Sequence, residues 1–82
     1  MREKLRSFVL RKFMPGAKPE DLRDDESFLD SGIIDSTGVV ELLSFLEEEF
    51  AIEIDDAEIV PENLDSIDNL CRFLKAKLTA VS

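Results

Sequence analysis

The chain has 82 residues, one cysteine, no histidine and a formal net charge of −9, so we expect one small domain. A lone cysteine excludes an intramolecular disulfide, and no apolar run reaches the roughly 18 residues of a membrane span. Acidity disfavours nucleic-acid binding, and residues 1–13 lack the apolar segment of a signal peptide. We therefore expect a cytoplasmic monomer that binds neither nucleic acid nor membrane.

The charges are segregated along the chain. Residues 24–71 contain sixteen Asp and Glu residues and neither Lys nor Arg, and all ten basic residues lie outside this segment. An acidic surface keeps proteins apart in solution, which is the ordinary interpretation. A long single-signed segment also repels itself and steers the molecule toward basic partners. Both interpretations remain open from charge alone.

Three segments have the apolar spacing of amphipathic helices. The first covers residues 2–13, the second begins at Asp35 or Ser36 and runs to about Phe50, and the third follows Asp65, its expected N-cap. The residues expected to be buried are Leu5, Phe8, Val9 and Phe13 in the first, Val39, Leu42, Leu43, Leu46 and Phe50 in the second, and Ile67, Leu70, Cys71, Leu74 and Leu78 in the third.

The first two helices are joined by a long loop, residues 14–35, which begins where Pro15 and Gly16 stop the first helix. A short turn is expected around residues 19–22. The apolar side chains of this loop are expected to dock on the helices, and they are Phe28, Leu29, Ile33 and Ile34.

The second connection is shorter. Residues 51–54 are interpreted as extended chain with Ile52 and Ile54 turned inward, followed by one short helical turn that Pro61 closes. The candidate caps of this turn are Asp55 and Asp56. The sequence therefore predicts an all-α fold, a bundle of three main helices plus one short helix with a long first loop. It forms a single domain over residues 1–82, and residues 79–82 are expected to fray.

The residue types argue against an enzyme. Without histidine a Ser-His-Asp arrangement is impossible. Cys71 lies on an apolar stripe, so it is interpreted as a core residue rather than a nucleophile. Residues 24–35 lack the alternating ligands and the central glycine of a calcium loop, and no Gly-rich phosphate loop is present. We predict neither catalytic residues nor a metal site.

Ser36 stands at the expected start of the second helix. A serine at this position is ordinarily a helix cap, but Asp35 offers a better cap and leaves Ser36 redundant in that role. A phosphate attached to the Ser36 oxygen would lie at the positive end of the helix dipole, close to free backbone N–H groups. The position therefore suits a covalently attached phosphate.

Acidic residues gather at the other end of this helix. Glu47, Glu48 and Glu49 oppose the helix dipole, at roughly 0.3–1 kcal/mol for each badly placed charge. A solvated polar face is the ordinary interpretation, and a partner-facing role is the alternative, because locally broken rules tend to mark function. A narrow strip beside the core stripe leads from Ser36 to these acids. This docking strip consists of Thr37, Val40, Glu41, Ser44, Glu47 and Glu48.

The segment DSTGVVELLSFLEEEF, residues 35–50, resembles the modification-site helix of acyl carrier and peptidyl carrier proteins. The expected order of helices is similar to that family over nearly the whole chain. The resemblance implies a four-helix carrier-protein bundle in which Ser36, preceded by Asp35, carries 4′-phosphopantetheine taken from coenzyme A. The thiol of this arm would hold acyl or aminoacyl groups as thioesters, and the carrier itself would not be an enzyme.

The resemblance also implies partners that dock on the strip. A phosphopantetheinyl transferase would attach the arm, an acyl- or aminoacyl-loading ligase would charge it, and downstream biosynthetic enzymes would receive the cargo. Thr37 stands where the family usually has a bulky apolar residue. The segments GIIDST and PENLDSI are more similar to freestanding carriers of specialised pathways than to housekeeping fatty-acid carriers. The competing hypothesis is a non-covalent acidic helical adaptor that docks on a basic protein and uses Ser36 only structurally.

Overall fold

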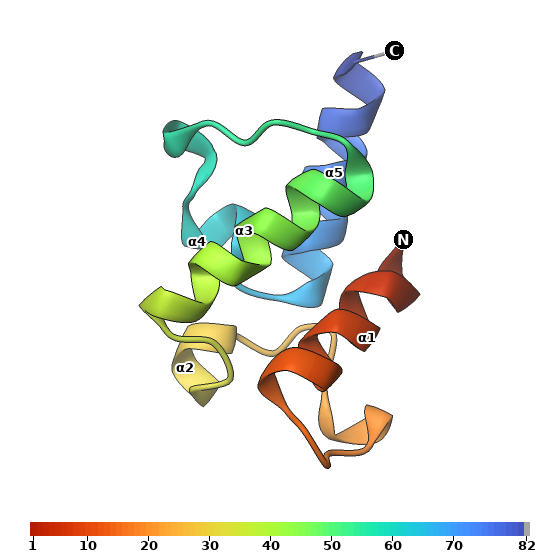
Figure 1. The fold of residues 1–82 in the computed structure, drawn as a ribbon, viewed down its shortest axis with the longest axis vertical. Coiled ribbons are helices and arrows are strands. Elements are labelled where there is room, and N and C mark those ends of the chain that lie inside the picture. The colour runs from red at the N-terminus through yellow and green to blue at the C-terminus, as the bar shows by residue number, and fades with distance from the viewer. Residues whose placement is uncertain (82) are drawn as a thin grey trace.

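The computed structural model describes the backbone of residues 1–81 and the side chains of residues 1–79, and every regular element in this part is helical (Figure 1). The three main helices are α1 (Arg2–Phe13), α3 (Ser36–Phe50) and α5 (Ile67–Val81). The shorter elements are the helices α2 (Phe28–Ser31) and α4 (Pro61–Leu64) and the 3₁₀ turns η1 (Pro19–Asp21) and η2 (Asp56–Glu58). The all-α prediction with three main helices is confirmed, and two short helices take the place of the one expected.

Helix α5 lies at the centre of the core. Its residues Ile67, Leu70 and Leu74 are completely buried, and Cys71 is 6% exposed, as expected for a core residue. The apolar faces of α1 and α3 and the loop residues pack around it. The buried cluster consists of Leu5, Phe8, Val9, Leu22, Phe28, Ile34, Leu42, Leu46, Ile52, Leu64, Ile67, Leu70, Cys71, Phe73 and Leu74.

The N-cap of α5 differs from the sequence prediction. Ser66, not Asp65, precedes the helix, and its buried hydroxyl accepts a hydrogen bond of 3.0 Å from the backbone N–H of Asn69. Asp65 instead accepts hydrogen bonds from the hydroxyl of Ser27 and the backbone N–H of Leu29. The prediction was wrong because Asp65 ends α4 and fastens α2, a role that depends on residues far away in the sequence.

The long first loop is pinned to α1 by arginine side chains. Arg6 donates to the carbonyl oxygens of Leu22 and Pro19, and it pairs with the carboxylate of Asp24 at 2.5 Å. Arg2 pairs with the same carboxylate at 3.0 Å. The predicted turn in this loop is confirmed as η1. These contacts bring the loop back across the bundle and position the residues that precede α3.

Apolar residues of the loop dock as predicted, with one exception. Phe28 and Ile34 are 2% exposed and Ile33 is partly buried, but Leu29 is 50% exposed. Phe28 and Leu29 are neighbours in the single turn of α2, so they point to different sides of it. Only the Phe28 side faces the core, which is why the expectation for Leu29 was wrong.

The connection after α3 has the predicted conformation, except at Pro61. Ala51 ends α3 with a left-handed φ of 53°, Ile52 is buried and Ile54 is partly buried. The expected short turn is η2, preceded by Asp55. Pro61 does not simply close this turn, because it is the first residue of α4, where its missing N–H leaves no hydrogen bond unmade.

The C-terminal part of α5 continues to Val81, and Ser82 lies outside the described residues. Fraying over residues 79–82 therefore stays a prediction. Across residues 1–81, none of the helices combines the length and the apolar character that crossing a lipid bilayer requires.

Candidate functional site

The start of α3 is set by Asp35, as predicted. Its backbone is extended, with φ −97° and ψ −176°, and its carboxylate oxygen Oδ1 accepts a hydrogen bond of 2.8 Å from the backbone N–H of Gly38. Its carbonyl oxygen accepts a second bond, of 3.1 Å, from the N–H of Val39. Because Asp35 satisfies the cap, Ser36 is the first helical residue, and its exposed side chain is not needed to hold the helix.

Gly38 allows neighbouring segments to approach the first turn of α3. It is buried, and a Cβ atom placed on it would lie 2.9 Å from Cε1 of Phe13 and 3.0 Å from Cγ2 of Ile34. Local sequence gives this glycine only a helix-weakening role. In the folded chain it lets the end of α1 and the loop before Ser36 pack directly against α3, which fixes the position of that serine.

The surroundings of Ser36 fit a phosphate ester. Among residues 1–79, no hydrogen bond involves the Ser36 hydroxyl or the backbone N–H groups of Ser36 and Thr37. These N–H groups lie at the positive end of a helix of 15 residues, a position that favours negative charge. An ester on this oxygen would displace no existing contact of the described chain.

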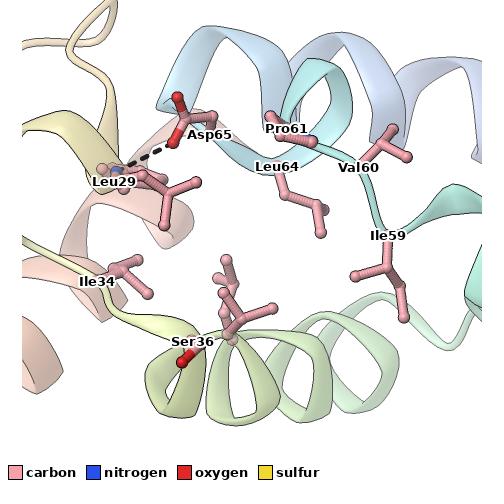
Figure 2. Close-up of a pocket in the computed structure, with 11 residues that line it drawn as sticks. Leu29, Ile34, Ser36, Ile59, Val60, Pro61, Leu64 and Asp65 are labelled. Carbon is pink, nitrogen blue, oxygen red and sulfur yellow. Dashed lines mark hydrogen bonds between the residues drawn. The ribbon is translucent and has the colours of Figure 1, made fainter.

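An apolar cavity of about 260 Å³ lies beside Ser36, between α3 on one side and α4 with the residues before it on the other. Figure 2 shows Ser36 at its rim, on the first turn of α3, with Ile59, Val60 and Leu64 across from it. The remaining lining residues are Phe28, Leu29, Ile34, Val39, Leu42, Pro61 and Asp65. The cavity was not predicted from the sequence, because its walls come from three separate segments whose apolar residues look like ordinary core positions.

The docking strip lies on the exposed side of α3. All six of its side chains are exposed, and Val40 is exposed to 63%. Its three carboxylates differ in their contacts. Glu41 pairs with Lys12 of α1, and Oε2 of Glu47 accepts a hydrogen bond of 3.0 Å from the N–H of Ile54. Glu48 has no ion pair or hydrogen bond within residues 1–79.

In the folded chain, basic residues from near both ends of the sequence lie beside acidic residues of its middle segment. Lys4 pairs with Glu49 at 2.8 Å, and Lys77 near the C-terminus pairs with Glu58 at 2.8 Å. The hydrogen bond from Lys77, and a second one from the backbone N–H of Asp55, lower the pKa of the Glu58 carboxyl below its ordinary value. Residues 1–79 contain no group of three or more acidic or cysteine side chains arranged to hold a metal ion.

Comparison with known proteins identifies the family of this chain. A sequence model of the phosphopantetheine attachment site family matches residues 14–74, which include Ser36 and the whole of α3. The chain belongs to the acyl carrier protein family. It accordingly bears a covalently attached 4′-phosphopantetheine group.

Individual carriers match over most of their length. The chain is 35% identical over 75 residues to an acyl carrier protein of Buchnera aphidicola subsp. Acyrthosiphon pisum (strain Tuc7), covering 92% of this chain and 89% of that protein. It is 49% identical over 64 residues to an acyl carrier protein of Chlamydia trachomatis serovar D, covering 76% and 78%. A chain in the crystal structure of an FAD-dependent dehydrogenase superposes with a TM-score of 0.75 at 27% identity, covering 85% of this carrier and 97% of that chain.

Proposed function

We propose that Ser36 is the attachment point of the phosphopantetheine arm and that the carrier holds acyl or aminoacyl groups on it for partner enzymes. The observation that carries this proposal is the exposed, uncommitted Ser36 hydroxyl at the first position of a helix whose cap is already supplied by Asp35. When bound, the arm supplies a terminal thiol that holds the cargo as a thioester. Asp35 holds the helix start in place, and the free N–H groups of the first turn favour the phosphate.

The carrier is not itself a catalyst in this proposal. No histidine is present in the chain, and the buried Cys71 is unsuited to attack a substrate. The base that activates the Ser36 hydroxyl for arm attachment therefore belongs to the phosphopantetheinyl transferase. A loading ligase and downstream biosynthetic enzymes would use the docking strip, whose exposed carboxylates and Val40 suit a basic surface with an apolar contact. Cytoplasmic residence remains our expectation from the sequence.

The proposed cargo is a short acyl or aminoacyl group of a specialised pathway. The cavity beside Ser36, at about 260 Å³, falls below the roughly 300–1,000 Å³ of pockets that enclose drug-sized ligands, so it has room for a small apolar group only. The segments GIIDST and PENLDSI support a specialised carrier. The similar chain in an FAD-dependent dehydrogenase structure makes a flavin-dependent dehydrogenase one partner to test.

Intact mass spectrometry tests the attachment. The purified apo chain is incubated with coenzyme A and a broad-specificity phosphopantetheinyl transferase, and we expect the mass to increase by one phosphopantetheine group. Ser36→Ala should gain nothing, whereas Ser7→Ala, which removes an exposed hydroxyl from α1 outside the docking strip, should gain the full mass. No gain by the parent chain, or a gain that survives Ser36→Ala, would sink the attachment proposal in favour of a non-covalent adaptor.

The cargo is tested on the modified chain. Candidate loading ligases are supplied with ATP and either amino acids, short acids or long fatty acids, and thioester formation is followed by intact mass. We expect amino acids or short acids to be loaded. Loading of long fatty acids alone would contradict the specialised-pathway proposal and leave the attachment proposal standing.

A further inference from the structure

The seam between α1 and α3 is formed by two facing rows of side chains, in which exposed charged residues flank a largely buried aromatic contact. Residues four apart share one side of a helix, and the row on α1 consists of Lys4, Phe8 and Lys12. The row on α3 consists of Glu41, Phe45 and Glu49. The two helices run side by side in opposite directions (Figure 1), so each lysine faces a glutamate and the two aromatic rings meet between the charged pairs.

The contacts across this seam are direct. Nζ of Lys12 lies 3.5 Å from Oε1 of Glu41, and Nζ of Lys4 lies 2.8 Å from Oε1 of Glu49. The two phenylalanine rings between these pairs stack with 4.0 Å between centroids and 10° between planes. Because the ring stack fixes the separation of the helices, the lysines are held beside the carboxylates.

Among residues 1–79, Glu41 is the one docking-strip carboxylate that is paired with a cation of the chain itself. The side chains of Lys12 and Glu41 are 48% and 50% exposed, so the pair is screened by water and a cation from outside can replace Lys12. Glu47 accepts a hydrogen bond from a backbone N–H, and Glu48 has no partner among residues 1–79. The docking carboxylates are therefore unequally available to a partner.

We propose that Lys12 competes with partner enzymes for Glu41 and so weakens their docking on α3. The partner in question presents Arg or Lys side chains to the docking strip, because the strip is acidic and the middle of the chain has no basic residue. When such a partner arrives, its cation replaces the Lys12 ammonium on Glu41. The inference rests on the proposed carrier function, and it assigns a regulatory role to a side chain of α1, outside the docking helix.

Arm attachment by the transferase measures the competition. Initial rates with limiting apo chain give kcat/KM at low salt for the parent and for Lys12→Gln. Because exposed ion pairs are weak, we expect Lys12→Gln to raise kcat/KM by about two- to fivefold. The increase should disappear at about 1 M salt, where charges are screened within about 3 Å.

Two control variants separate competition from net charge and from folding. Lys75→Gln removes the same charge from an exposed position of α5 that has no ion pair within residues 1–79, so its kcat/KM should stay near the parent value. Lys12→Arg keeps a cation beside Glu41 and should also stay near the parent value. In a Glu41→Gln background, Lys12→Gln should no longer raise the rate, because the contested carboxylate is gone.

Equal kcat/KM for Lys12→Gln and Lys75→Gln at low salt would overturn the inference, and so would a full increase in the Glu41→Gln background. Neither result would affect the proposed function, because the parent chain would still receive the arm on Ser36. A parent chain that receives no arm would instead overturn the proposed function itself.

Discussion

Helices α3 and α5 have 15 residues each and both bury leucines in the core, but they differ in the residues that they expose and in the charges near their C-terminal ends. Helix α5 places Leu70 and Leu74 in the centre of the core and has no acidic residue after Asp68, so its C-terminal half carries no charge that opposes the helix dipole. Helix α3 leaves Val40 exposed and has three glutamates in its last turns, where they oppose the dipole. The comparison teaches that both helices stabilise the core, whereas α3 also gives up part of its own stability to present an acidic surface that extends from Ser36 along the helix.

The largest expected effect is the removal of a core side chain from α5. Leu70→Ala should lower the free energy of unfolding by about 2–5 kcal/mol, because it removes a fully buried side chain and leaves a cavity. The matched change on α3, Val40→Ala, should stay within about 0.5 kcal/mol because Val40 is exposed. Urea unfolding of both variants measures the difference, and similar losses would show that Val40 contributes to the core instead of standing exposed on α3.

The next largest effect on stability is expected when the capping side chain of a helix is removed. Asp35→Ala and Ser66→Ala each remove a side chain that accepts a backbone hydrogen bond at a helix start, so each should lower the free energy of unfolding by about 0.5–2 kcal/mol. Only Asp35→Ala should also slow arm attachment, because it loosens the turn that holds Ser36. The transferase rate, measured well below the melting temperature of each variant, checks this, and equal slowing by both variants would contradict it.

Gly38→Ala tests how closely neighbouring segments pack against the first turn of α3. Alanine should favour the helix by up to about 1 kcal/mol, but its methyl group would crowd Phe13 and the buried Ile34, and overpacking costs about 1–3 kcal/mol. We expect a net loss of about 1 kcal/mol in the free energy of unfolding, read from urea midpoints. A gain in stability would mean that Phe13 moves aside without cost and that the close approach is not a constraint on the site.

The smallest effect concerns the ion pair at the end of α5. Because Lys77 lowers the pKa of Glu58 in the folded state, this contribution to stability is complete above the ordinary glutamate pKa of about 4.3 and is lost as the pH falls through the lowered pKa. Lys77→Met keeps an unbranched side chain and removes the ammonium group, whose Nζ lies over the Phe73 ring at 5.9 Å from its centroid. We expect the variant to be slightly less stable near neutral pH.

The same variant should lose less stability than the parent when the pH is lowered from about 5 to about 3. Urea unfolding at both pH values measures the two losses. Parallel loss by parent and variant would show that Lys77 does not set the titration of Glu58.

The sequence by itself determined the elements of this protein whose causes are local. The apolar spacing of α1, α3 and α5 identifies these helices, because each must bury one face. The Asp35-Ser36 pair at the start of an acidic helix identifies the family, since cap, serine and charges follow one another in the chain. These features can be recognised without knowing which segments contact one another in the fold.

Only the tertiary structure decided the contacts between distant segments. Asp65 looks like a helix cap from its neighbours, but it fastens α2 through Ser27, which lies 38 residues earlier. Leu29 looks like a core residue, but the orientation of α2 exposes it. The cavity beside Ser36 and the pairing of Lys12 with Glu41 are also formed by segments that lie far apart in the sequence. They depend on how the elements pack in space, and periodicity within one segment carries no information about its neighbours across the bundle.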